Sequence, residues 1–120
     1  MYGLRKDIDL QFLKGRELEQ IAIGLYQVIF SFDENVAISV EGQFKFFDGS
    51  REWIWKQEPN CTEAAAKTVA LLGQNIERFE AHEDGTLILS FGSNKRLTIL
   101  DSSKEYQSYD ITRPGQTIVV

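Results

Sequence analysis

The sequence predicts a mainly β (α+β) fold, in which two duplicated antiparallel β-meanders pack as a sandwich or a partly open barrel and one α-helix, at about residues 61–72, links them. Three observations lead to this prediction. Short runs of aromatic and β-branched residues alternate with turn residues along most of the chain. A single alanine-rich segment in the middle has helical spacing instead. A pattern of glycine, short strand, hairpin and strand occurs once on each side of that segment.

Five strands are expected before the helix, because five short runs carry strand-forming residues and are separated by turn residues. The run YQVIFSF, from Tyr26 to Phe32, is rich in aromatic and β-branched side chains. Further along, Phe44 and Phe46 alternate with polar residues, and Asp48-Gly49-Ser50 marks a turn. The expected strands are residues 20–24, 26–32, 36–40, 43–46 and 51–56.

The hydrophobic period changes at the segment CTEAAAKTVALLG, which predicts the helix at about residues 61–72. Asn60 precedes it and Glu63 follows three residues later, a spacing that suits an N-terminal capping arrangement. The three consecutive alanines favour helix, and Gly73 is placed to end it. The residues expected to share one face are Ala65, Val69 and Leu72.

Five more strands are expected after the helix. Asp84-Gly85 is a strong hairpin dipeptide. Pro114-Gly115 matches the middle of a type II turn, because glycine accepts the positive φ that the third position requires. This turn predicts a hairpin of Tyr109–Thr112 with Thr117–Val120, so the last four residues should form a docked strand rather than a loose tail. The expected strands are residues 76–83, 86–91, 96–100, 106–111 and 117–120.

The two halves share a pattern that predicts an internal repeat within a single domain, residues 1–120. LKGRELEQI aligns with LLGQNIERF, and after one insertion VIFSF aligns with LILSF. Short apolar strands can align by chance, but the glycine, glutamate and asparagine matches fall in the same order, which favours repeat units at about 13–58 and 71–120. These matches are Gly15 with Gly73, Glu19 with Glu77 and Asn35 with Asn94.

The composition disfavours several classes of function. With 18 acidic against 13 basic residues the net charge is −5, whereas nucleic-acid binding needs lysine and arginine to displace counterions. No apolar run approaches the roughly 20 residues that span a bilayer, and charges interrupt the N-terminal segment, so we expect no membrane association and a cytoplasmic location. Mild acidity would speed encounter with a basic partner, although it also serves solubility alone.

The sequence assigns no residue to catalysis, to a cofactor or to a metal. His82 would need an orienting carboxylate to act as a general base, and an exposed strand-end residue among acids is the more common situation. Cys61 lies beside the first helical turn, where the helix dipole can lower a thiol pKa, but a buried inert thiol is more common. One histidine and one cysteine exclude a zinc-finger type of site, and no Walker loop, dinucleotide fingerprint or nucleophile elbow occurs.

The segment REWIWKQE carries the candidate partner-binding residues. Trp53 and Trp55 are two positions apart, so on a strand both indoles share one face and Ile54 lies on the other. If Ile54 faces the core, the indoles face outward beside Glu52 and Glu58, which is the composition of an interface hot spot. In the alternative, the core or the helix covers the indoles, as is common for large aromatic side chains.

Three motifs resemble a family of small bacterial proteins that is known mainly as a domain of unknown function. They are the L-x-G-x-x-L/I-E repeat, the run D-x-S-x-E-Y-x-S-Y that begins at Asp101, and the closing I-V-V. The resemblance covers most of the chain, and because its motifs are structural it implies no catalytic residue. In size, acidity and lack of chemical motifs, the chain is also similar to the immunity proteins of bacterial toxin systems.

These observations favour a non-enzymatic protein-binding module, most concretely an immunity-type inhibitor that neutralises a toxin by direct binding, with a basic toxin domain as its partner. One alternative is a small-ligand-binding β-barrel or an uncharacterised enzyme, which needs an apolar pocket between the two repeats. Another is a self-associating structural protein, a homodimer that pairs through an edge strand such as Thr117–Val120.

Overall fold

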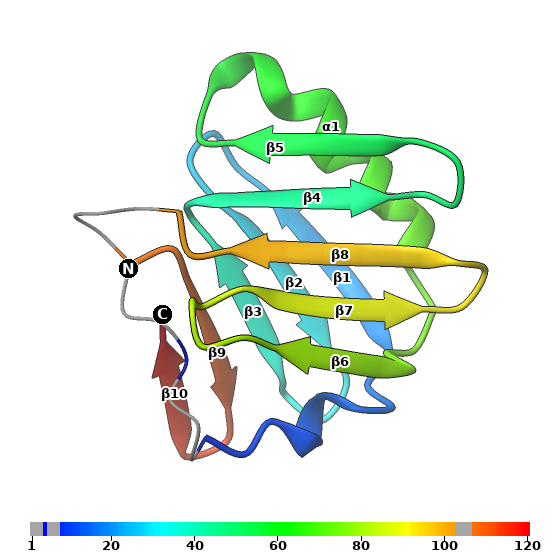
Figure 1. Ribbon diagram of the computed structural model, residues 1–120. Coiled ribbons are helices and arrows are strands. Elements are labelled where there is room, and N and C mark those ends of the chain that lie inside the picture. The colour runs from blue at the N-terminus through cyan, green and yellow to red at the C-terminus, as the bar shows by residue number, and fades with distance from the viewer. Residues whose placement is uncertain (1–3, 5–7, 103–106) are drawn as a thin grey trace.

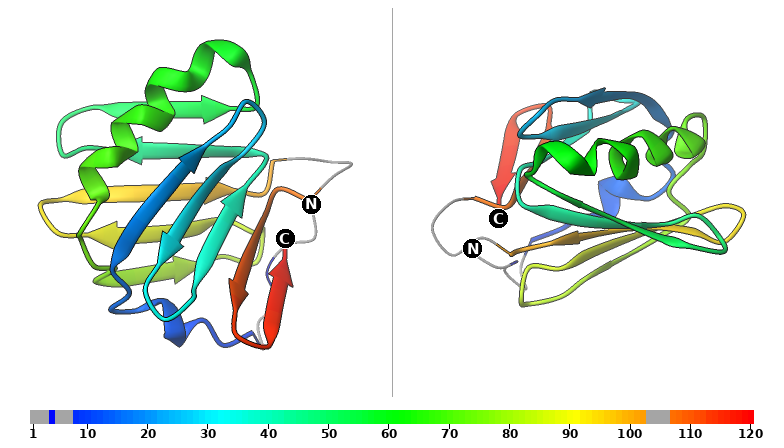
Figure 2. Two further views of the ribbon diagram at one scale, coloured as in Figure 1. Left: turned by 180° about the vertical axis from the view of Figure 1, so that it is seen from behind. Right: turned by 90° about the horizontal axis from the view of Figure 1, so that it is seen from above.

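The computed structural model describes residues 4, 8–102 and 107–120 of the chain. Their strands form two antiparallel five-stranded sheets that lie face to face (Figure 1, Figure 2). The first sheet consists, in spatial order, of β1 (Leu18–Ile23), β2 (Val28–Phe32), β3 (Ala37–Val40), β9 (Tyr109–Arg113) and β10 (Gln116–Val119). The second consists of β5 (Glu52–Lys56), β4 (Gln43–Phe47), β8 (Lys95–Leu100), β7 (Leu87–Phe91) and β6 (Arg78–Ala81).

The prediction of a mainly β fold with one helix is therefore confirmed, and the described strands do not close into a barrel. Each of the ten expected strands overlaps an observed one. Tyr106, the expected start of the ninth strand, lies outside the described residues, and β9 begins at Tyr109. Among the described residues, no helix has the length and apolar character needed to cross a membrane.

The hydrophobic core lies between the two sheets and is built mainly from alternate side chains of the central strands. β2 and β7 both have buried side chains at their first, third and fifth positions, the period of two expected for strands with one buried face. Phe30 of β2 meets Phe44 of β4 edge to face, with ring centroids 5.5 Å apart, so the two sheets are in contact near their centre.

Each sheet combines strands from both halves of the chain. The meander β1-β2-β3 is extended by the hairpin β9–β10 from the second half, and the meander β6-β7-β8 is extended by the hairpin β4–β5 from the first half. The hairpin β9–β10 forms as expected, with Thr117 opposite Thr112 and Gly115 at a φ of +81°. The last strand of the chain is thus paired within a sheet (Figure 1).

The helical segment is shorter as α-helix than expected, because 3₁₀ turns flank it on both sides. η2 (Pro59–Cys61) precedes α1 (Thr62–Lys67), and η3 (Thr68–Leu71) follows it. The segment contacts β5 and β1 and covers the edge of the sandwich between these two strands (Figure 2). η1 (Gln11–Leu13) lies in the N-terminal part of the chain, before β1.

Two expectations about the helix were wrong. Cys61, not Asn60, is at the N-cap position and no side chain caps the helix, because η2 places Asn60 inside a 3₁₀ turn. Val69 and Leu72 are half exposed, at 50% and 42%. After Lys67 the chain winds with three residues per turn instead of 3.6, which rotates the inward face to other positions. The buried residues of the segment are Ala64, Ala65, Thr68 and Leu71.

Candidate functional site

The tryptophan pair does not form an exposed patch. Trp55 is 1% exposed and stacks on Phe44, with ring centroids 5.3 Å apart and an interplanar angle of 14°. The register of β5 with β4 places Trp55 opposite Phe44, on the inward face, and leaves Ile54 45% exposed on the outer face. The arrangement with both indoles outward is therefore wrong, and the covered alternative is the one observed.

Trp53 is half-buried and is held by charged neighbours near helix α1. The guanidinium of Arg51 lies 4.0 Å from the centroid of its ring and the ammonium of Lys67 lies 4.8 Å from it. Its indole Nε1 donates to Oδ2 of Asp48 at 3.1 Å. Cation–π contacts of this kind contribute about 0.5–1 kcal/mol each at exposed sites. The contacts made by Trp53 thus stabilise the end of the β4–β5 hairpin.

The carboxylate of Asp48 organises the turn between β4 and β5. Oδ1 accepts hydrogen bonds from the amides of Ser50 at 2.9 Å and Arg51 at 2.8 Å. These bonds, first that from Ser50, hold the pKa of Asp48 well below its ordinary value, because they stabilise the ionised form. Asp48 therefore acts as a structural carboxylate.

Glu52 and Glu58, the acidic members of the predicted patch, are both exposed. Glu52 lies on β5, at the edge of the second sheet, and Glu58 lies in the connection between β5 and η2. The structure thus leaves both carboxylates accessible to a partner but separates them from the indole of Trp55.

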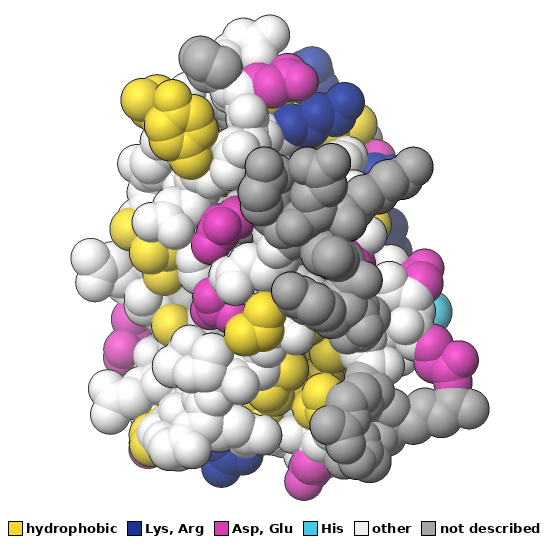
Figure 3. Space-filling model, turned by 90° about the vertical axis from the view of Figure 1, so that its left-hand side faces the viewer, with side chains coloured by type: hydrophobic (Ala, Val, Ile, Leu, Met, Phe, Trp, Pro, Cys, Tyr) yellow, Lys and Arg dark blue, Asp and Glu magenta, His cyan; other side chains and the backbone are white. Residues whose placement is uncertain are grey.

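The most exposed large apolar side chains lie at the tip of the hairpin between β1 and β2. Leu25 is 63% exposed and the adjacent Tyr26 is 65% exposed, while Ile23 at the end of β1 is 39% exposed. Figure 3 shows hydrophobic side chains that protrude near the top of the molecule, at the level of this hairpin in Figure 1. Large apolar side chains here are unusual, since glycine and small polar residues dominate hairpin turns.

A hydrogen bond connects this tip to the segment that carries the predicted site. Nε2 of Gln57 donates to the backbone carbonyl of Tyr26 at 2.9 Å, across 31 positions of sequence. The bond brings the apolar tip beside the segment that contains Glu58, whose side chain is exposed. We define the tip patch as Ile23, Leu25, Tyr26, Gln57 and Glu58. Its only signal in the sequence is the apolar Leu25-Tyr26 pair directly after Gly24.

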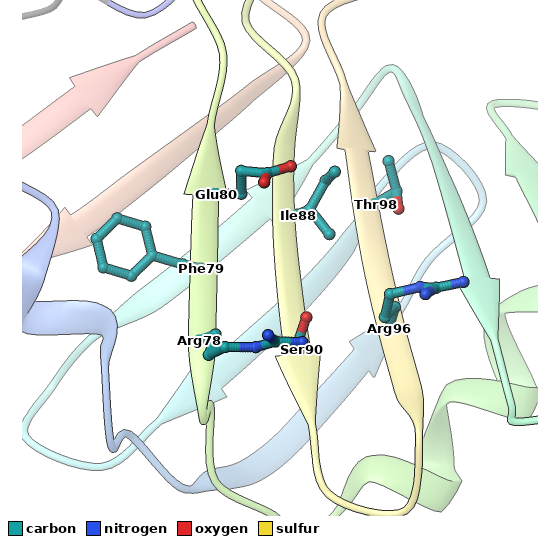
Figure 4. A pocket seen from close by; sticks show the side chains of 7 residues that line it. All are labelled: Arg78, Phe79, Glu80, Ile88, Ser90, Arg96 and Thr98. Carbon is teal, nitrogen blue, oxygen red and sulfur yellow. The ribbon is translucent and has the colours of Figure 1, made fainter.

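A second surface feature is a groove on the outer face of the second sheet. Side chains of β6, β7 and β8 line a hollow of about 470 Å³ (Figure 4). A second hollow of about 310 Å³ adjoins it and extends to the β7–β8 turn. The residues shared by the two hollows are Arg78, Ser90 and Arg96, which lie side by side on the three strands. Guanidinium and hydroxyl groups together favour the binding of carboxylate or phosphate oxygens.

Two other titratable groups in the described part of the chain, His82 and Tyr109, are held by local contacts. Nε2 of His82 lies 3.0 Å from Oε2 of Glu80, and both side chains are exposed next to the β6–β7 turn. Burial raises the pKa of Tyr109, whose hydroxyl donates to the carbonyl of Gly85 at 2.7 Å. In the described part of the chain, no group of three or more histidine, cysteine, aspartate or glutamate side chains is placed to hold a metal ion.

Comparison with known proteins places the chain in one family. No significant match was found among the curated proteins or among the solved structures. Residues 9–120 match the family described as a family of unknown function, DUF6188. Because this match covers nearly the whole chain, the protein belongs to the DUF6188 family.

Proposed function

We propose that the protein is a non-enzymatic protein-binding module that binds its partner through the tip patch, and that it acts as an immunity-type inhibitor of a bacterial toxin. The observation that carries the proposal is the exposure of Leu25 and Tyr26, two adjacent large side chains at 63% and 65%. Burial of one leucine-sized side chain contributes about 1.5–3 kcal/mol, so removing both from water would supply a substantial part of a binding energy. Tyrosine is also enriched among the residues that dominate binding at interfaces.

The structure of the hairpin supports a preformed binding surface. β1 and β2 pair up to Ile23 and Val28, and the amide of Gly24 donates to the carbonyl of Gln27 at 2.9 Å to close the turn. The bond from Gln57 to Tyr26 holds the tip from a second direction. A tip fixed in this way loses little conformational entropy on binding, which favours affinity.

Charge indicates the kind of partner. The exposed Glu58 directly follows Gln57, which bonds to the tip, and the whole chain has a net charge of −5. Negative potential speeds the encounter with a basic protein and disfavours acidic competitors. A basic toxin domain with an apolar depression therefore fits the tip patch.

The packing of the core argues against the ligand-binding barrel. The edge-to-face contact of Phe30 with Phe44 and the stacking of Trp55 occupy the space where a pocket between the repeats would lie. Three hollows that are lined by described residues all open on the surface of the molecule. A role as a binding protein requires no internal cavity.

The proposal is tested by growth rescue in a bacterial host. The C-terminal domain encoded by the adjacent upstream gene is expressed alone, together with this protein, and together with the double variant Leu25→Ala, Tyr26→Ala. We expect the wild-type protein to restore growth and the double variant to fail. Direct binding of the two purified proteins, measured by calorimetry, should show the same loss.

Two single variants serve as matched controls. Ile54→Ala and Val119→Ala each remove an apolar side chain of comparable exposure, 45% and 43%, on other surfaces. Both should rescue growth as well as wild type. The tip patch is wrong as the binding site if the double variant is folded and rescues growth fully, and the toxin partner is wrong if wild-type protein gives no rescue.

A further inference from the structure

The outer face of the second sheet is richer in cations than the rest of the chain. Along the strands of this sheet, buried inward residues such as Phe46 and Leu97 alternate with side chains that point outward. The outward basic side chains are Lys45, Lys56, Arg78 and Arg96, and the acidic ones on the same strands are Glu52 and Glu80. Basic residues are therefore in excess on this face, although acids outnumber bases in the sequence. No described element covers the face (Figure 1).

Two arginines dominate the groove on this face. In the registers of β6, β7 and β8, Arg78 lies opposite Ser90 and Ser90 lies opposite Arg96, so the arginines are two strand spacings apart, about 9.5 Å. In Figure 4 Arg78 extends toward Ser90, and Arg96 extends toward β4. The Arg96 guanidinium lies 4.8 Å from the ring centroid of Phe47.

Both guanidiniums retain their capacity to bind an anion. Within the described residues, the guanidinium of neither Arg78 nor Arg96 has a hydrogen bond or an ion pair, although the chain carries 18 carboxylic side chains. The stacking of Arg96 on Phe47 leaves the N–H groups at the guanidinium edge free to donate. The hydroxyls of Ser90 and Thr98 add further donors to the same hollow.

We propose that this groove binds an acidic, extended segment of a partner protein, whose carboxylates pair with Arg78 and Arg96 while an apolar side chain rests on Ile88. The shape favours a peptide, because the two hollows are open and run across three strands instead of enclosing a small molecule. Glu77 and Glu80 border the hollows, and their charges repel a doubly charged phosphate more than a carboxylate.

This inference goes beyond the proposed function, because the groove lies on β6 to β8 and the tip patch lies on the β1–β2 hairpin and the connection after β5. The two surfaces also differ in charge, so they suit different partners. The variant with both tip residues changed should bind the acidic segment like wild type. Failure of one proposal therefore leaves the other intact.

The test uses a fluorescent, end-blocked peptide of three Glu-Leu repeats and a second peptide in which glutamine replaces each glutamate. Binding to the full-length protein is followed by fluorescence anisotropy at low and at high salt. We expect the glutamate peptide to bind, salt to weaken it, and Arg78→Gln or Arg96→Gln each to lower the affinity about tenfold, since bonds to charged groups are the stronger ones. Equal binding of the glutamine peptide, or no binding of the glutamate peptide, would overturn the proposal.

The control variant is Arg113→Gln, in which the lost guanidinium lies 4.4 Å from the ring of Phe12, away from the groove. It should leave the affinity within twofold of wild type, and thermal unfolding confirms that all variants are folded. A loss as large as that of the groove variants would show non-specific charge attraction. Displacement of the peptide by inorganic phosphate, at concentrations where acetate has no effect, would identify a phosphate site and overturn the assignment to a carboxylate.

Discussion

Glu17 and Asn75, which lie 58 positions apart in the sequence, face each other in an isolated antiparallel bridge. Next to the bridge, the amide of Gly15 donates to the carbonyl of Ile76 at 2.7 Å. The bridge joins the entrance of one meander to the entrance of the other, because β1 begins at Leu18 and β6 at Arg78. The two halves of the chain are thus held together at the point where each meander starts.

An equivalent hydrogen bond lies on the other side of the bridge, where the amide of Gly73 donates to the carbonyl of Leu18 at 2.8 Å. Gly73 and Ile76 follow Gly15 and Leu18 by the same 58 positions, so corresponding residues of the two halves exchange the donor and acceptor roles in these two bonds. The strand orders of the two sheets correspond in the same way. The meander β1-β2-β3 of the first sheet matches the meander β6-β7-β8 of the second. The two sheets thus share one strand order, while an internal repeat that arose by duplication stays a prediction.

Each half of the chain contributes a hairpin to the sheet that contains the meander of the other half, β4–β5 to one sheet and β9–β10 to the other. We therefore predict that the two halves depend on each other for folding. If the chain is divided in the exposed connection after Glu58, fragment 1–58 keeps the hairpin β4–β5 but loses β8, its partner in the sheet. Fragment 59–120 keeps β9–β10 but loses β3. We expect neither fragment to fold alone, and the two expressed together to form a one-to-one complex with the circular dichroism spectrum of the intact chain. A folded monomer of either fragment, seen by light scattering, would contradict this.

Local signals predicted the strands and turns well, because the residues that decide them are neighbours in the sequence. Asn35 and Asn94 each lie between two of the expected strands, and both have positive φ, at 58° and 60°. The preceding Glu34 and Ser93 have the same conformation, so each hairpin turns through two consecutive left-handed residues. The alternation of VIFSF and of LILSF likewise translates directly into buried and half-buried positions.

The candidate site was less predictable, because it depends on contacts between distant segments. The spacing of Trp53 and Trp55 indicates that they share a face but not which face is inward, and only the pairing of β5 with β4 decides this. The exchange of hairpins between sheets has no local signal either. The tip patch depends on the bond from Gln57 to Tyr26, which joins residues 31 positions apart.

The burial of Trp55 predicts a large loss of stability for Trp55→Ala. The substitution removes the ring stacked on Phe44 and leaves a cavity in the core, which typically costs about 3–5 kcal/mol. Urea unfolding followed by circular dichroism measures the difference. Ile54→Ala, one position away on the outer face, is the control and should cost clearly less. Similar losses for the two variants would show that the inward and outward faces of β5 are assigned wrongly.

Gly85 should tolerate no side chain. Its φ is +96°, and a Cβ placed on it would overlap the side chain of Asp101. The carbonyl of Gly85 also accepts the hydrogen bond from the buried hydroxyl of Tyr109, so the backbone has little room to move. Gly85→Ala should therefore destabilise the fold more than Gly115→Ala, where φ is +81° but nothing lies within 4 Å of the added atom. Gly115→Ala should lower the free energy of unfolding only by the penalty of the left-handed conformation, about 1–2 kcal/mol. Thermal unfolding measures both variants, and equal losses of stability would contradict the steric explanation.

The turn carboxylate of Asp48 predicts a specific pH dependence of stability. The amide of Ser50, followed by that of Arg51 and the indole of Trp53, holds the pKa of Asp48 below its ordinary value of 3.8. The unfolded chain therefore binds a proton at Asp48 before the folded chain does, so the contribution of Asp48 to stability is complete above pH 4 and is lost as the pH falls below it. Asp48→Asn should lower the melting temperature most at pH 7, and the difference from wild type should shrink toward pH 2. A difference that stays constant from pH 7 to pH 2 would mean that the charge of Asp48 does not stabilise the turn.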